Sequence, residues 1–308
     1  MKKLTIYTLA LITALQFTAC SDNDDILTPS DYNDDFFGVP ADAVGPEADL
    51  RREFLRETGS HLLFTDTLRS TLIGVDPNGK NIYEHETIDF AWNLTSYDDY
   101  YDWKPSYLKD DIENKRKSAD LFRENIMPHI KGSSMSPYSV LLLADLEIYD
   151  DWEYDFVPAV TTSCWRCLAV NVKGWIEAQS AEEANEHTIA ICKALVSDKF
   201  TYNCNEAKPW FAISNDYYWE YISDYIEDWE GGDMETIYSL GFLSYYEDWR
   251  GRPYYDEFNG TKNDFEDFFN ALFDRSEDDF TAEYGNYPII MEKYRFMKEL
   301  IEKTGYKF

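Results

Sequence analysis

Basic residues are scarce in this chain of 308 residues: 28 Lys and Arg stand against 59 Asp and Glu, a formal net charge of −31. Nucleic-acid binding needs clustered Lys and Arg that neutralise phosphates, so this composition excludes nucleic acid as a natural partner. Histidine is scarce too, and no two of His61, His85, His129 and His187 have the i, i+4 spacing with which a helix presents two imidazoles to zinc. The sequence therefore lacks a histidine-pair metal motif.

Hydrophobic runs long enough to cross a bilayer are also missing. A helix that crosses a bilayer needs about 20 apolar residues. The apolar segment Leu4 to Phe17 has 14 residues, follows two lysines and ends shortly before Cys20. This order is typical of a secretory signal peptide with cleavage before Cys20 and lipidation of its thiol. The following Ser21-Asp22-Asn23-Asp24-Asp25 resembles the acidic export signal of surface lipoproteins of Bacteroidota. We expect an outer-membrane lipoprotein that is lipid-anchored and exposed at the cell surface.

The remaining composition sets the domain organisation. Aromatic residues make up 17% and apolar residues 44% of the chain, enough to build a hydrophobic core. Residues 1–19 are predicted as the signal peptide, 20–45 as the lipidated cysteine with an acidic flexible tether, and 46–308 as a single domain.

Hydrophobic periodicity predicts an α+β fold with a small mixed sheet in the first half and a mainly helical second half. We expect a helix over Pro46–Thr58 that ends at Gly59, because Pro and acidic residues open it. His61–Thr65 and Tyr83–Leu94 read as an antiparallel pair around a turn at Asp76–Gly79. Further strands are expected at 140–143 and 167–172, and further helices at 115–127 (stopped by Pro128), 181–196, 263–273 and 289–303.

The expected helix 181–196 bears on whether the protein is an enzyme. Its Thr188, Ile191, Cys192 and Leu195 recur at i, i+3, i+4 and i+7 and should form one buried face. This segment resembles the zinc-binding metallopeptidase-like surface lipoproteins of Bacteroidota, whose helix reads Thr-Ile-His-His-Glu-Phe-x-His. In that alignment Ile191 and Leu195 replace the two metal-binding histidines and Cys192 replaces the catalytic glutamate, so the motif is degenerate.

Three later segments extend the resemblance: Gly241–Tyr246, Asn263–Asp267 and the closing helix with Met291, Lys293, Tyr294 and Met297. The resemblance implies a zincin-like metallopeptidase scaffold. Aliphatic side chains cannot donate lone pairs to zinc, so we expect no catalytic residue, no metal site and no cofactor. Asp267 matches an acidic position of the family and could bind a cation, although a solvated carboxylate is the simpler interpretation.

Cysteine spacing leaves several chemistries open. Cys164-Trp165-Arg166-Cys167 has the spacing of a redox or zinc half-site, and Cys192 and Cys204 complete four thiols besides Cys20. In an oxidising exterior they could form two disulfides, in one of three pairings, or they could be inert buried thiols.

Two clusters of aromatic and acidic residues, 97–103 and 217–221, are the candidate ligand-binding elements. Tyr101, Trp103, Tyr218 and Trp219 could stack on sugar rings, or these rings could pack the core. We therefore expect a non-catalytic protein for peptide or glycan capture, or an accessory protein of an outer-membrane uptake complex. The alternatives are an active zinc metallopeptidase with non-standard ligands, and a glycoside hydrolase that uses carboxylate pairs such as Asp98 and Asp102 or Glu227 and Asp228.

Overall fold

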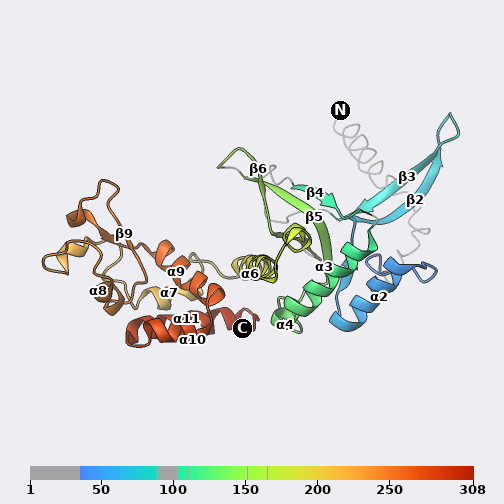
Figure 1. Ribbon diagram of the computed structural model, residues 1–308. Helices are drawn as coiled ribbons and strands as arrows, with labels where there is room; N and C mark the ends of the chain where they lie inside the picture. Colours follow the sequence, from blue (N-terminus) through green and yellow to red (C-terminus); the bar gives the residue numbers. More distant parts are fainter. Residues whose placement is uncertain (1–34, 89, 91–102, 110, 151, 165) are drawn as a thin grey trace, which may run out of the picture. The chain divides into compact units, whose positions relative to one another are not determined.

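The computed structural model describes residues 35–88, 90, 103–109, 111–150, 152–164 and 166–308 (Figure 1). The expected signal peptide, Cys20, Tyr101, Asp98 and Asp102 lie outside the described residues. One folded unit comprises Phe37–Phe308. Residues 37–45, predicted as part of the tether, belong to this unit: Phe37 is buried, and its carbonyl accepts a hydrogen bond of 3.3 Å from Arg51 Nη2.

The central element is a six-stranded mixed sheet in the first half of the chain, as predicted. Its main order is β1 (His61–Leu63), β5 (Ser139–Asp150), β8 (Cys167–Asn171) and β7 (Thr161–Ser163), while β4 (Trp103–Tyr107) and β6 (Asp155–Pro158) also pair with β5. β1 and β8 run parallel to β5, and the other pairings are antiparallel.

The side chains of β5 alternate between two hydrophobic clusters. Val140 and Leu142 belong to the larger cluster, whereas Leu141 and Leu143 belong to a second cluster on the other face of the sheet. Successive residues of a strand point to opposite faces, so a sheet that is covered on both sides needs a continuous apolar run. This explains the four consecutive apolar residues 140–143.

The predicted hairpin partners are wrong in one respect. The turn at 76–80 joins β2 (Thr67–Val75) to β3 (Asn81–Thr87), and these two strands form a separate antiparallel hairpin. β1, which was expected to pair across this turn, instead pairs in parallel with β5, with His61 opposite Ser139. Leu62 and Leu63 are buried in this position. Pairing with the distant β5 is therefore favoured over pairing across the nearby turn, because it places both side chains in the core.

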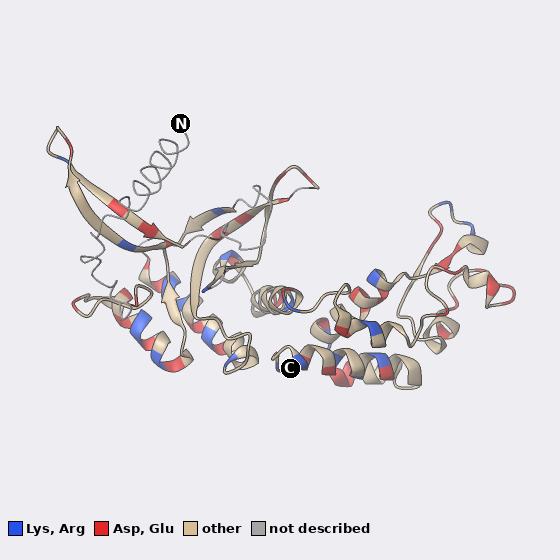
Figure 2. Cartoon of the chain, turned by 180° about the vertical axis from the view of Figure 1, so that it is seen from behind, with Lys and Arg blue, Asp and Glu red and all other residues tan. Residues whose placement is uncertain are grey.

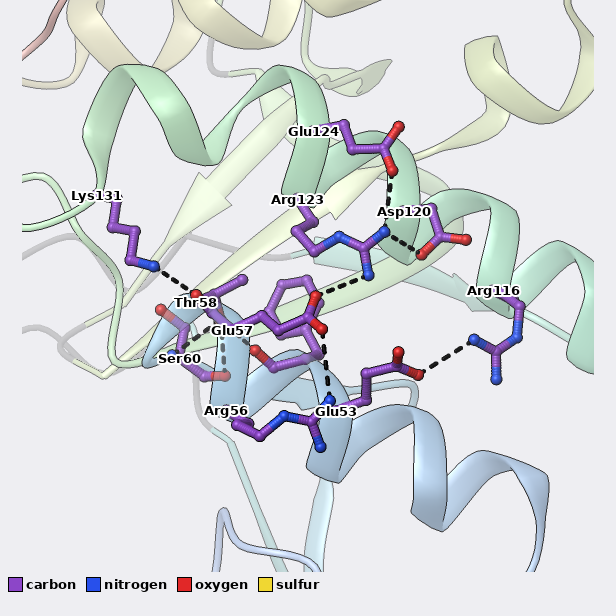
Figure 3. Close-up of polar contacts among 11 residues, drawn as sticks. Glu53, Arg56, Glu57, Thr58, Ser60, Arg116, Asp120, Arg123, Glu124 and Lys131 are labelled. Atoms are coloured by element: carbon purple, nitrogen blue, oxygen red, sulfur yellow. Dashed lines mark hydrogen bonds and ion pairs between the residues drawn. The ribbon is translucent and has the colours of Figure 1, made fainter.

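Helices α2 (Pro46–Thr58) and α3 (Ile112–Asn125) pack together and are joined by ion pairs (Figure 3). Arg123 lies 3.0 Å from Glu57, and Arg116 lies 3.3 Å from Glu53. α3 begins three residues before the predicted Lys115, because the Asp111 carboxylate caps it by accepting hydrogen bonds from two backbone N–H groups.

The prediction that Pro128 stops this helix is wrong, because α3 already ends at Asn125. Pro128 lies in the first turn of the short helix α4 (Met127–Ile130), a position where the missing N–H has no helical partner.

The second half is mainly helical, as predicted. Its helices are α5 (Lys173–Glu177), α6 (Ala181–Ser197), α7 (Lys208–Phe211), α8 (Met234–Ser239), α9 (Thr261–Asp274), α10 (Glu277–Tyr284) and α11 (Pro288–Lys303). Short 3-10 turns η2 (Asn205–Ala207), η3 (Ile222–Asp224) and η4 (Pro253–Tyr255), and a two-residue ladder of β9 (Tyr245–Tyr246) with β10 (Glu257–Phe258), lie between them. The larger hydrophobic cluster draws side chains from α2 through α11, so both halves share one core. Among the described residues, no helix is long and apolar enough to span a membrane.

Candidate functional site

The three positions of the degenerate zinc motif lie in the core. Ile191, Cys192 and Leu195 on α6 are all buried in the larger hydrophobic cluster, as the predicted apolar face requires. Burial also raises the pKa of the Cys192 thiol, which keeps it protonated. This face of α6 therefore has a packing role and presents no metal-binding group to a cleft.

Candidate metal ligands elsewhere are dispersed. In the described part of the chain, no three His, Cys, Asp or Glu side chains are grouped so that they could hold a metal ion. His187 Nε2 lies 2.7 Å from the Asn171 carbonyl, and its ring packs so closely on Gly174 that a Cβ there would approach it to 2.4 Å. His187 is therefore a packed structural residue.

The four described cysteines have free thiols. Cys164 and Cys167 flank the turn between β7 and β8, where the Cys164 N–H donates to the Cys167 carbonyl. Burial raises the pKa of the Cys167 thiol to about 12, so this thiol is protonated at neutral pH. The arrangement of the described cysteines agrees with the inert-thiol alternative, and none of the three possible disulfide pairings is formed among them.

The three later segments of the resemblance converge at a buried ion pair. Lys293 on α11 donates hydrogen bonds of 2.7 Å to both carboxylate oxygens of Asp264 on α9, and one of 2.8 Å to the Gly241 carbonyl. The Tyr218 hydroxyl donates to Asp264 as well, at 2.7 Å. Burial raises the pKa of Asp264 and lowers that of Lys293, while the attraction between the two charges opposes both changes.

This ion pair joins α9 to α11, and a ligand cannot reach it because both side chains are fully buried. The Lys293 ammonium also lies 4.6 to 4.7 Å from the ring centroids of Trp210, Phe242 and Phe268. Its cation is thus compensated by a carboxylate, a carbonyl and aromatic faces. We assign the ion pair a structural role next to the neighbouring groove.

An open groove with a volume of about 600 Å³ lies beside this ion pair, between β9 and α9. Its floor is a hydrogen-bonded triad: Ser244 Oγ donates to Asp267 at 2.5 Å, and Asn259 Nδ2 donates to both Ser244 and Asp267, at 2.7 and 3.1 Å. The remaining lining residues, mostly exposed, are Tyr245, Tyr246, Glu247, Asn263, Glu266 and Asn270. Amide, hydroxyl and carboxylate groups therefore converge on one open surface.

The charge of the groove is negative. Glu247, Glu266 and Asp267 are acidic, and none of the nine lining residues is basic. Two lysines reach its edge: Lys262 lies 3.8 Å from Glu266, and Lys193 donates to Asn270 at 2.9 Å. Asp and Glu are spread over the whole folded chain (Figure 2), so the groove shares the general acidity.

Asp267 is the acidic residue of the groove whose pKa is shifted from its ordinary value. Burial raises its pKa, the hydrogen bond from Ser244 opposes this effect, and the nearby Asp264 charge adds to it. Its Oδ2 accepts both floor hydrogen bonds, and no hydrogen bond within the described residues involves its Oδ1. A ligand hydroxyl could donate to this oxygen.

The predicted ligand-binding aromatics differ in exposure. Trp103 packs on Phe90 with ring centroids 4.5 Å apart, and Tyr218 is turned towards Asp264. Trp219 alone among the described candidates is well exposed, at 61%. Its ring lies on Gly260, where an added Cβ would meet it at 1.8 Å, and Gly260 directly follows Asn259 of the groove floor. Trp219 is thus an exposed ring near the groove floor, outside the nine residues that line the groove.

Sequence reasoning missed Tyr246, Asn259 and Asn263 as groove residues. Tyr246 and Asn263 were visible only as parts of the resemblance, and Asn259 gave no signal at all. The carboxylate pair Glu227 and Asp228 is exposed in the loop between η3 and α8 and does not line the groove between β9 and α9.

Comparison of the chain with protein-family models, curated proteins and solved structures finds no match in any of the three. The class that fold and site define is therefore an α+β protein with an open, acidic, amide-lined groove. The resemblance to metallopeptidase-like lipoproteins stays a prediction.

Proposed function

We propose that this protein is a non-catalytic, lipid-anchored capture protein of the outer-membrane surface that binds glycans in the groove between β9 and α9. Its scaffold is metallopeptidase-like and lacks the zinc motif, and an outer-membrane uptake complex is its expected partner. The observation that carries the proposal is the Ser244, Asn259 and Asp267 floor beside two exposed rings, Tyr246 and Trp219.

The chemistry of the groove favours a glycan over a peptide. Sugar hydroxyls donate to carboxylates and accept from amides, and the apolar faces of sugar rings stack on aromatic side chains. A peptide that adds a strand would need a longer free edge than β9 and β10, which have two residues each. The acidic lining also disfavours polyanionic glycans. The proposed ligand class is a neutral or amino-substituted saccharide.

The experiment is a binding screen of the purified full-length protein in mild detergent against neutral, amino and acidic oligosaccharides, followed by calorimetry of the best ligand. Asp267→Asn keeps the shape of the floor and removes its charge, so we expect it to weaken binding about tenfold. Glu299→Gln is the matched control, because Glu299 is exposed on α11 outside the groove. Absence of saccharide binding would refute the proposal, and release of reducing ends would favour the hydrolase alternative.

A further inference from the structure

An exposed row of tyrosines continues from the groove. β9 and β10 pair with Tyr246 opposite Glu257, and Tyr221 forms a further bridge to Glu257. Residues that lie opposite each other on antiparallel strands point to the same face. Tyr246, Glu257 and Tyr221 therefore line up on one face of this small ladder.

The opposite face of the ladder is core. Phe258 and Ile222, which neighbour Glu257 and Tyr221 in sequence, are fully buried with Phe242 in a third hydrophobic cluster. Because successive residues of a strand point to opposite faces, Tyr246, Glu257 and Tyr221 lie on the face that is turned away from this cluster. On that face Tyr246 is 45% exposed and Tyr221 38%.

Tyr255 is a third exposed tyrosine and lies next to Tyr221. Its ring is 40% exposed and stands edge-on to Tyr221, with ring centroids 5.8 Å apart. Arg252 lies 4.2 Å from the Tyr255 centroid and is held at 2.8 Å by Asp248, so the ring is fixed from one side. We call Tyr246, Tyr221 and Tyr255 the tyrosine row.

We infer that the groove ligand is an oligosaccharide whose chain leaves the groove at Tyr246 and runs along the tyrosine row. This inference rests on the proposed function and specifies the ligand as a chain rather than a single sugar. Tyr246 belongs both to the groove lining and to the row, so the two surfaces are continuous. Tyr246 and Tyr221 are two strand spacings apart, about 10 Å, which is more than one sugar ring spans.

Glu257 argues for a sugar chain over a flat protein partner. Its carboxylate position lies between the two rings, on the same face. A packed apolar partner would bury this charge without a counter-charge, which is costly. Sugar hydroxyls would donate to it while the sugar rings stack on the tyrosines at either side.

The test is calorimetry of the full-length protein with gluco-, xylo- and manno-oligosaccharides of one to six units. For the series that binds, we expect affinity to rise about tenfold from the shortest to the longest member. Tyr221→Ala should abolish this rise and leave the affinity for the shortest ligand unchanged, whereas Tyr221→Phe should keep it. Trp152→Ala is the control, because Trp152 is 92% exposed in the turn between β5 and β6.

The outcomes separate the two claims. If wild-type protein binds a saccharide with an affinity that does not depend on chain length, the inference about the tyrosine row is wrong, while the proposal of saccharide binding in the groove is kept. The same conclusion follows if Tyr221→Ala behaves as wild type. If Tyr221→Ala fails to fold, as judged by circular dichroism, Tyr255→Ala replaces it with the same expected result. If no saccharide binds, the proposed function itself fails.

Discussion

Lys293 and Asp264 form an ion pair in which both side chains have 0% exposure and Nζ lies 2.7 Å from the carboxylate. Removing one partner leaves a buried charge uncompensated, so Lys293→Met alone should lower the free energy of unfolding by about 3–5 kcal/mol. The double variant Lys293→Met with Asp264→Asn should cost less than the sum of the two single variants. Urea denaturation measures these values, and additive costs would contradict the pairing.

A surface ion pair provides the matched control. Lys298 lies 2.6 Å from Glu277, with side-chain exposures of 27% and 55%. Solvent screens such a pair, so Lys298→Met should change the free energy of unfolding by less than about 1 kcal/mol.

Asp267 should make stability depend on pH in a defined direction. Its folded-state pKa is raised by burial, so the folded protein holds this proton more tightly than the unfolded chain. The stabilising contribution is present below the ordinary Asp pKa of about 4 and is lost as pH rises through the raised value. Asp267→Asn cannot ionise and should be more stable than the parent at pH 7.5.

The same variant should match the parent in stability near pH 3.5, measured by urea unfolding at both pH values. Because we expect it also to bind the saccharide less tightly, gain of stability and loss of binding should occur together. A variant that is less stable at pH 7.5 would show that the carboxylate is structural.

Thiol reactivity should follow burial. Cys167 has a pKa raised to about 12, and Cys192 is likewise buried with a raised pKa. The thiolate is the reacting species, so iodoacetamide at pH 8 should label Cys164 and Cys204, which are half-buried, before these two. Mass spectrometry of tryptic peptides checks the order, and labelling in urea should make all four equivalent. Fast labelling of Cys167 in the native protein would contradict the prediction.

The position of the Trp219 ring should require a residue without a Cβ at position 260. A Cβ at Gly260 would lie 1.8 Å from this ring, so Gly260→Ala must displace it and should weaken saccharide binding as Trp219→Ala does. Gly74→Ala is the control, since its added Cβ meets nothing within 4 Å. Calorimetry with the ligand from the screen measures both. Full binding by Gly260→Ala would remove Trp219 from the proposed site.

Zinc content tests the meaning of the degenerate motif. Aliphatic Ile191 and Leu195 offer no lone pairs, so we expect a zinc-to-protein ratio near zero by plasma mass spectrometry after dialysis. A ratio near one would place the ligands outside α6, with Cys164, Cys167 or Asp267 as candidates, and would revive the peptidase alternative.

Local signals in the sequence sufficed for the main helices. α2 has the predicted bounds Pro46–Thr58, because Pro46 opens it and Gly59 ends it in the left-handed conformation at φ 82°. The predictions for α6, α9 and α11 are within two residues of the observed ends. Capping and periodicity act over one or two turns, so they can be read without knowledge of the fold.

Strand partners could not be read in this way. The pairing of β1 with β5 joins His61 to Ser139, which lies 78 residues further along the chain. Nothing near residue 61 in sequence specifies that partner, because the choice depends on which strand completes a core covered on both faces.

Tyr218 and Trp219 show the same limit at the candidate site. As neighbouring aromatic residues they were equivalent in sequence, yet Tyr218 bonds to Asp264 on α9 and Trp219 is exposed with a positive φ of 64°. The partner that decides between them lies 46 residues further along the chain.

By itself, the sequence determined the α+β class, the main helices, the buried face of α6 and the acidity that disfavours nucleic acid, because each depends on composition or on residues within a few turns. The tertiary structure alone decided the partner of β1, the exposure of Trp219, the groove floor of Ser244, Asn259 and Asp267, and the tyrosine row. Those features arise where segments far apart in sequence meet, and their geometry follows from packing of the whole core.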